Sequence, residues 1–238
     1  MRNTYSQENG DLSIQVTRDF FKNVYSYMFA ALLISGLVAY TVGSDEQLFI
    51  DWFVTSDGSI SSLFWIVMFA PIGLSLLIQW GYNRLSTPIL IFLFASFSGL
   101  MGLSLSSIFL VYEMTAIYST FFVASGAFAG MAVLGYTTKT DLSKFGSLLY
   151  MVFIGMFIAG IVNIFIGNEL FDFVLACIGV FVFTGLTAYH MQALKKMSKD
   201  QHLDTESRNK LALIGGLQLY ILFINLFLSL LRIMGGRD

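Results

Sequence analysis

The stretch PILIFLFASFSGLMGLSLSSIFLVY, residues 88–112, contains no charged residue. A helix needs about 20 predominantly apolar residues to cross a bilayer, and this stretch is longer than that. A membrane-spanning β-strand would be about half as long and would alternate apolar with polar residues. Backbone groups in hydrocarbon must also find their hydrogen-bond partners inside the segment, which a helix provides. The stretch therefore predicts a membrane-spanning α-helix.

The same pattern recurs along the chain, because charged residues divide it into seven apolar blocks of similar length. We expect an all-α membrane protein with one transmembrane domain over residues 23–236. Residues 1–22 are polar and mixed in charge, and we expect them to form a cytoplasmic tail. The predicted spans cover about residues 23–43, 60–80, 87–111, 116–136, 146–167, 172–192 and 211–232.

The composition excludes an ordinary water-soluble domain. Hydrophobic residues make up 56% and charged residues 12% of the chain, whereas soluble domains carry about 25% charged residues. The lipid bilayer is therefore the expected surrounding. The formal net charge is −2, and no stretch is strongly basic, which argues against a nucleic-acid partner.

Lysine and arginine predict the orientation, since they are enriched in cytoplasmic loops. With the N-terminus inside, all but two of the 13 Lys and Arg residues fall in the tail and the second, fourth and sixth loops. Only Arg232 and Arg237 fall outside. We therefore expect a cytoplasmic N-terminus and an external C-terminus. No secretory signal is recognisable, because the first apolar block is long enough to be retained as a span. A plasma membrane is the expected location.

The sequence offers little chemistry for an enzyme. It has two histidines and one cysteine, too few for a zinc cluster of those residues. No span contains a lysine for a Schiff base, and no phosphate-binding or dinucleotide motif is present. We predict no enzyme activity, no cofactor and no metal site.

Small residues and prolines predict how the helices pack. Ala95, Gly99, Gly102 and Ser106 form one stripe, and Gly126 and Gly130 form a GxxxG pair. Such stripes usually allow two helices to approach closely. Pro71 lies inside the second predicted span, where it is expected to produce a kink.

Two titratable or charged groups near the predicted cytoplasmic boundary are candidates for a gating or proton-sensing role. His190 lies in the sixth span, five residues before Lys195. It is either a neutral histidine hydrogen-bonded at a helix end or a proton switch, since histidine titrates near neutral pH. Arg84 ends the second block and is either an interfacial anchor or the partner of another polar group.

Polar residues in the seventh span form a second group of candidates. Gln218, Asn225 and Ser229 share one helix face, with Leu222 between them. A polar stripe in a span should face the protein interior or a wet cavity. Helix–helix hydrogen bonding and a solvated pathway both fit this pattern, and Asn163 in the fifth span is a candidate for the same interior.

Four segments resemble the Bax inhibitor-1 family, also called the transmembrane Bax inhibitor motif family, and the resemblance covers about residues 15–236. The segments are NRLSTPILIFLFASFSGLMGLSLSSIFLVY (83–112), AVLGYTTKTDLSKFGSLL (132–149), FVFTGLTAYHMQALKK (181–196) and LQLYILFINLFLSLLRIMGG (217–236). The last of these is the most specific.

The resemblance implies seven helices with the last one enclosed by the other six, and a proton-sensitive calcium leak. It also implies two aspartates, on the sixth and seventh helices, that share a proton, and an arginine that engages them. In this chain His190 and Leu222 occupy the two aspartate positions, and Arg84 matches the arginine. A carboxylate pair that shares a proton therefore cannot form here.

Two functions remain open. The first is a passive calcium or cation leak with altered or absent pH gating. The alternative is a non-channel regulator that binds a membrane protein, because some bacterial relatives are thought to modulate a membrane-bound ATP-dependent protease.

Overall fold

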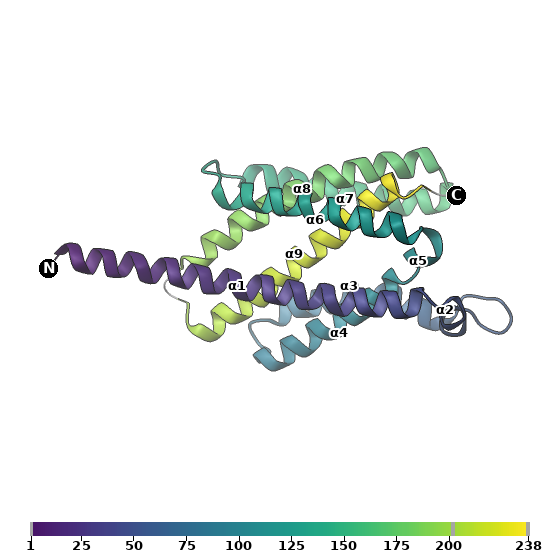
Figure 1. The fold of residues 1–238 in the computed structure, drawn as a ribbon, viewed down its shortest axis with the longest axis horizontal. Coiled ribbons are helices and arrows are strands. Elements are labelled where there is room, and N and C mark those ends of the chain that lie inside the picture. The colour runs from purple at the N-terminus through teal and green to yellow at the C-terminus, as the bar shows by residue number, and fades with distance from the viewer. Residues whose placement is uncertain (1, 201–202, 237–238) are drawn as a thin grey trace. The chain divides into compact units, whose positions relative to one another are not determined.

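The computed structural model describes the backbone of residues 2–200 and 203–236, and within these ranges the side chains from residue 14 onward. These residues form nine helices, shown in Figure 1. In chain order they are α1 (Arg2–Gly43), α2 (Glu46–Phe53), α3 (Ser62–Gly81), α4 (Thr87–Leu105), α5 (Ile108–Val111), α6 (Met114–Thr137), α7 (Ser143–Ile166), α8 (Glu169–Ser198) and α9 (Thr205–Met234).

In the described part of the chain, seven segments are long and apolar enough to cross a membrane. Each overlaps one predicted span, and α4 and α5 together make up the third. This confirms the all-α fold class with seven spans. The last helix, α9, has the largest buried share, 67% of its most apolar window. Its enclosure by the other six helices stays a prediction.

The first helix is longer than its span. Residues 2–22, which were predicted as a tail, are helical and continue into α1 without a break. Thr17, Phe20 and Phe21 are already buried, so α1 packs against other helices before the predicted start of its span.

The helices form two compact units. The first contains Met1–Val111 and Met197–Tyr220, and the second contains Tyr112–Lys196 and Ile221–Asp238. The first half of α9 therefore belongs to the first unit and its second half to the second unit.

In the first unit, α4 packs along both α1 and α3. It comes close to α1 at Gly102, where an added Cβ would lie 2.7 Å from the Ser35 carbonyl oxygen and 2.8 Å from Val38 Cβ. The packing prediction is therefore confirmed at Gly102. It is wrong at the other end of the stripe, because Ala95 is exposed and Gly99 has no described neighbour within 4 Å of an added Cβ.

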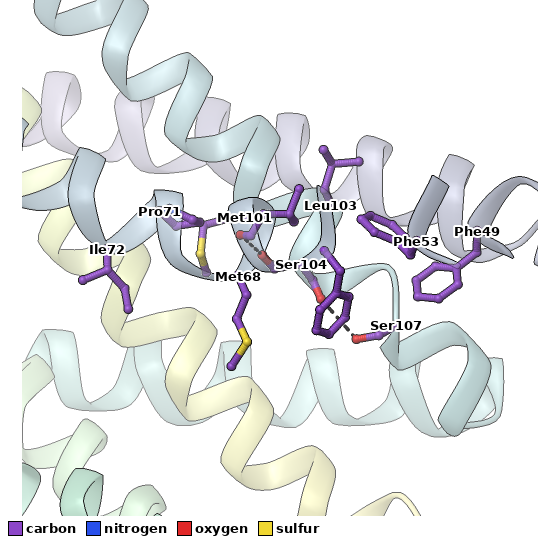
Figure 2. Close-up of a pocket in the computed structure, with 11 residues that line it drawn as sticks. Phe49, Phe53, Met68, Pro71, Ile72, Met101, Leu103, Ser104 and Ser107 are labelled. Carbon is purple, nitrogen blue, oxygen red and sulfur yellow. Dashed lines mark hydrogen bonds between the residues drawn. The ribbon is translucent and has the colours of Figure 1, made fainter. Parts of the chain in front are cut away.

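The proline of α3 is accommodated by a hydrogen bond from α4. Pro71 has no N–H, so it cannot donate to the carbonyl of Val67 one turn earlier. The Ser104 hydroxyl donates to that carbonyl at 2.9 Å, which is a dashed line in Figure 2. Polar side chains of neighbouring helices commonly replace the donor that a membrane proline removes. The helix runs unbroken from Ser62 to Gly81.

Two local features near the ends of α4 and α1 were not predicted. Helix α4 ends at Leu105, because Ser106 and Ser107 donate their hydroxyls to the carbonyls of Leu103 and Ser104 and so compete with the helical backbone pattern. The loop after α1 contains the short helix α2, whose N-cap Asp45 accepts from the backbone N–H of Leu48 at 3.1 Å.

In the second unit, helices approach each other at glycines that the stripes did not include. A Cβ at Gly135 of α6 would lie 2.6 Å from Ala188 Cα of α8. A Cβ at Gly179 of α8 would lie 2.5 Å from the Ser229 hydroxyl of α9. By contrast, the predicted close approach at Gly126 and Gly130 is wrong, since no described atom lies within 4 Å of either added Cβ. Those two glycines lie on an open face of α6.

Candidate functional site

The site is centred on His190, near the end of α8 that is predicted to be cytoplasmic. Its side chain is only 9% exposed, and its Nε2 atom lies 2.6 Å from the Tyr150 hydroxyl of α7. The Tyr189 ring stands edge-on to the imidazole, with 5.3 Å between ring centroids. A neutral imidazole accepts a hydrogen bond from the tyrosine hydroxyl or donates one to it, depending on its tautomer, whereas an imidazolium donates to the tyrosine oxygen. The contact can therefore exist in both protonation states.

A glycine brings the two helices together at this point. Gly146 lies one turn before Tyr150 on α7, and a Cβ there would lie 2.6 Å from Cγ of Tyr189. One turn before Tyr189 on α8, a Cβ at Gly185 would lie 2.6 Å from Leu149 Cδ1. The absence of side chains at both glycines sets the α7–α8 spacing that allows the histidine–tyrosine hydrogen bond.

The loop between α6 and α7 is attached to the last turns of α8. Gln192 accepts from the Leu142 backbone N–H at 2.8 Å and donates to the Thr140 carbonyl at 2.7 Å. Lys195 donates to the Tyr136 carbonyl at 2.6 Å, and its ammonium lies 4.5 Å from the centre of the same tyrosine ring. These bonds hold residues 138–142 beside the helix that carries His190.

An ion pair completes this attachment. Lys196 lies 3.0 Å from Asp141 Oδ1, and that carboxylate also accepts from the hydroxyl and the backbone N–H of Ser143. The Ser143 hydroxyl, the Lys196 ammonium and the Ser143 N–H together lower the pKa of Asp141 from 3.8 to about 2. The pair is solvent-exposed, so it positions the loop more than it stabilises the fold.

The remaining residues predicted on the seventh span lie on α9. Leu222 is buried. Asn225 donates to the Ile221 carbonyl at 2.8 Å, and the Ser229 hydroxyl donates to the Asn225 carbonyl at 2.8 Å. Both polar side chains therefore bond the backbone of their own helix, while Gln218 is half-buried. Their role as pathway-lining groups stays a prediction.

Asn163 and Arg84 have more local surroundings. Asn163 donates to the Asn168 carbonyl at 3.1 Å and accepts from the Asn168 N–H at 3.2 Å, so it fixes the turn after α7. Arg84 is exposed in the short connection between α3 and α4. It belongs to the first unit and His190 to the second, and their pairing stays a prediction.

Two residues of this site were missed by the sequence analysis. Tyr150 lies one helical turn after Gly146, in the direction of the partner helix, and this spacing is a usable signal once α7 and α8 are paired. Gln192 follows His190 in the segment AYHMQ, but its loop partners are about 50 residues away in the sequence. The described residues contain no group of three His, Cys, Asp or Glu side chains arranged to hold a metal ion.

Seven apolar helices, two of which are joined by a contact between the buried His190 and the partly exposed Tyr150, define a multi-pass α-helical membrane protein. The chain belongs to the Bax inhibitor-1 family, because the family model described as inhibitor of apoptosis-promoting Bax1 matches residues 17–238. This confirms the resemblance found in the sequence.

Individual relatives match over nearly their whole length. An uncharacterized protein of Borreliella burgdorferi is 40% identical over 224 residues, 94% of each chain. The inner membrane protein YbhL of Escherichia coli K12 is 38% identical over 226 residues, 92% of each chain. An uncharacterized protein of Rickettsia prowazekii is 39% identical over 220 residues, 92% of this chain and 90% of the relative.

Proposed function

We propose that this protein is a passive calcium or cation leak of a bacterial plasma membrane, in which His190 is the group that responds to protons. Membership of the Bax inhibitor-1 family supports the leak. The observation that supports the altered gating is the hydrogen bond between His190 Nε2 and the Tyr150 hydroxyl, since the His190 side chain is only 9% exposed. Histidine is the side chain whose unperturbed charge change falls between about pH 5 and 8.

Protonation of His190 would introduce a full positive charge into a mostly apolar part of the protein. Charged side chains at membrane depth cost several kcal/mol, with estimates starting at about 2.5. Two of the groups that contact His190 are Tyr150 from α7 and Tyr189 from its own helix. Lys195, five residues further along α8, is a positive charge near the same end of the helix and donates to the Tyr136 carbonyl. Protonation therefore adds a positive charge between α7 and α8, which disfavours cations nearby.

The proposed orientation puts the N-terminus in the cytoplasm and the C-terminus outside. It rests on the lysine and arginine distribution. The relative from Escherichia coli is named an inner membrane protein, which supports a plasma-membrane location. With this orientation the loop at residues 138–142 and the last turn of α8 face the cytoplasm.

The test is calcium flux into proteoliposomes at pH 6 and pH 8. We expect the parent to conduct less at pH 6, and we expect His190→Ala to remove the difference between the two pH values. Tyr150→Phe, which keeps the ring and removes the hydroxyl, should shift the pH response without abolishing flux. The double change His190→Asp with Leu222→Asp is a useful comparison, since it introduces the carboxylate pair implied by the family.

Two results would count against this proposal. Equal flux in protein-free and protein-containing vesicles would remove the leak itself. The second result is a parent protein whose flux does not depend on pH, together with a double aspartate variant whose flux does. It would show that His190 does not gate the leak and that this chain keeps only the fold of the family.

A second candidate is a regulator that binds a membrane protein such as a membrane-bound ATP-dependent protease. The observation that favours it is the length of α1, which continues as helix to Arg2, well before the span that the sequence predicts from residue 23. A helical extension is a suitable surface for a partner at the membrane. Crosslinking in membranes followed by mass spectrometry tests this function, with a variant lacking residues 2–13 as the control. Recovery of the same proteins with both forms would argue against the extension as the binding element.

A further inference from the structure

The first unit contains a pocket of about 300 Å³ between α2, α3 and α4. Phe49 and Phe53 of α2 form one end and Met68 and Ile72 of α3 form a side wall, as Figure 2 shows. Val67 of α3 also lines the pocket. Neither the family match nor the candidate site around His190 assigns any role to this pocket. Its position and its walls indicate what it holds.

The walls are apolar, and their few hydroxyls are already used. The Ser104 hydroxyl donates to the carbonyls of Val67 and Leu100, at 2.9 and 3.1 Å. The Ser107 hydroxyl donates to the Ser104 carbonyl at 3.1 Å. A water molecule needs two to four polar partners to be held in a cavity, and these walls offer it little. An empty cavity of this size would lose the dispersion contacts of every side chain that lines it.

The pocket lies at the depth of lipid hydrocarbon. Val67 to Ile72 are about 8 to 15 Å along the helix axis from Ser62, the first residue of α3. Trp65 and Trp52 are 49% and 42% exposed, and exposed tryptophans are enriched at the boundary between headgroups and hydrocarbon. The pocket therefore begins just inside that boundary, where acyl chains are the surrounding medium.

The pocket is open toward its surroundings on the α3 side, because two lining residues, Met68 and Ile72, are 44% and 51% exposed. At the other end of the pocket lies α2, which is an amphipathic helix. Its Phe53 is buried in a cluster with Val42 and Val67, whereas Glu46 and Asp51 on the same helix are exposed. Such a helix lies in the membrane interface with its apolar side inward.

We propose that this pocket binds one acyl chain of a membrane phospholipid, with α2 covering the chain from the headgroup side. The chain enters between the exposed side chains of α3 and lies against Met101 and Leu103 of α4. The recognised chemistry is a saturated or unsaturated hydrocarbon chain, and no polar group of the pocket is required for binding.

The test uses the full-length protein in phosphatidylcholine vesicles that contain one of two photoreactive lipids. One lipid carries a diazirine in the middle of an acyl chain, and the other carries it on the headgroup. After illumination, the labelled residues are mapped by mass spectrometry. We expect the mid-chain lipid to label Met101 and the headgroup lipid not to. Phe165, which is 85% exposed on α7, serves as the reference for general contact with lipid.

A filled pocket should exclude the chain. In Val67→Phe the larger ring occupies the pocket, and we expect severalfold less mid-chain labelling of Met101 with unchanged labelling of Phe165. The matched control is Ile66→Phe, which adds a ring at the adjacent position of α3, where the side chain is 58% exposed and does not line the pocket. In Ile66→Phe, the mid-chain lipid should label Met101 as strongly as it does in the parent protein.

Either of two results would overturn the proposal. The first is a parent in which the mid-chain lipid labels Phe165 and leaves Met101 unlabelled, a result that needs no variant to fold. The second is equal labelling of Met101 in Val67→Phe and Ile66→Phe, provided that both unfold at the temperature of the parent.

Discussion

The hydrogen bond between Ser104 and the carbonyl of Val67 predicts a specific loss of stability in Ser104→Ala. Val67 is 3% exposed, so its carbonyl has no access to solvent. The helical donor for this carbonyl would be the N–H of residue 71, which is a proline. The Ser104 hydroxyl, at 2.9 Å, is the donor that replaces it. Alanine at position 104 leaves a buried acceptor without its donor.

The expected cost follows from this geometry. A buried acceptor without a donor costs about 1–3 kcal/mol in soluble proteins, and hydrogen bonds between membrane helices contribute about 0.6 kcal/mol on average and up to about 1.7. Alanine recovers a few tenths of a kcal/mol through its helix propensity. We therefore expect Ser104→Ala to lower the free energy of unfolding by about 1 kcal/mol.

A second substitution separates this bond from other effects of removing a hydroxyl. In Pro71→Ala, the new backbone N–H donates to the Val67 carbonyl within α3. Ser104→Ala should then cost almost nothing in the Pro71→Ala background, which gives a coupling energy of about 1 kcal/mol in a double-mutant cycle. Ser125→Ala is the matched control, because the exposed Ser125 hydroxyl bonds only the Phe121 carbonyl of its own helix, at 2.8 Å.

The assay is reversible unfolding in mixed micelles with increasing dodecyl sulfate, followed by circular dichroism. The four proteins of the cycle and the Ser125→Ala control are measured under one set of conditions. The reasoning is refuted if Ser104→Ala costs no more than Ser125→Ala. It is also refuted if the cost of Ser104→Ala is the same with proline and with alanine at position 71.

Three further predictions concern the second unit. Gly135→Ala should lower the melting temperature of the protein, because the added methyl group meets the α8 backbone. Gly130→Ala adds a methyl group in open space and should leave the melting temperature unchanged or raise it. Thermal melts compare the two variants, and equal shifts would contradict the assigned packing. Gln192→Leu removes both bonds to the loop, so hydrogen exchange of residues 138–142 should become faster, and unchanged exchange would show that other contacts hold the loop. The pKa of Asp141 is lowered from 3.8 to about 2, so its ion pair with Lys196 is fully present above pH 3.8 and is lost only as the pH falls through about 2. Hydrogen exchange of residues 138–142, corrected for intrinsic rates, should therefore be the same at pH 6 and pH 4. A loss of protection between these two pH values would contradict the assigned pKa.

The spans could be predicted from the sequence because the signal for a membrane helix is local. A block such as residues 88–112 shows by its own length and composition that it crosses the bilayer. The break after Leu105 was missed, since it depends on the direction in which the hydroxyls of Ser106 and Ser107 point. Helix α2 was missed because eight residues of mixed polarity in a loop give no comparable signal.

The packing glycines show a different limit. The pair Gly126 and Gly130 has the spacing of a helix–helix contact, yet it lies in open space, while the isolated Gly135 and Gly146 are covered by α8. Spacing along one helix identifies a face on which another helix can pack. Whether a helix occupies that face depends on the partner, and here α8 supplies the backbone at Ala188 and the ring at Tyr189.

The candidate site was predicted in part, because His190 was identified by its type and depth, whereas its partner came from the structure. The Tyr150 hydroxyl turns an isolated titratable group into one end of a contact between two helices. The contact matters because His190 and Leu222 occupy the two positions at which the family resemblance implies aspartates. Protonation of an aspartate pair removes one negative charge, and protonation of a histidine adds one positive charge. The local change is +1 in both cases, so a cation leak that is closed electrostatically at low pH would keep its direction of response when His190 replaces the pair. Only the pH range and the contact that carries the change would differ, and the flux of the parent and of Tyr150→Phe between pH 6 and pH 8 measures both.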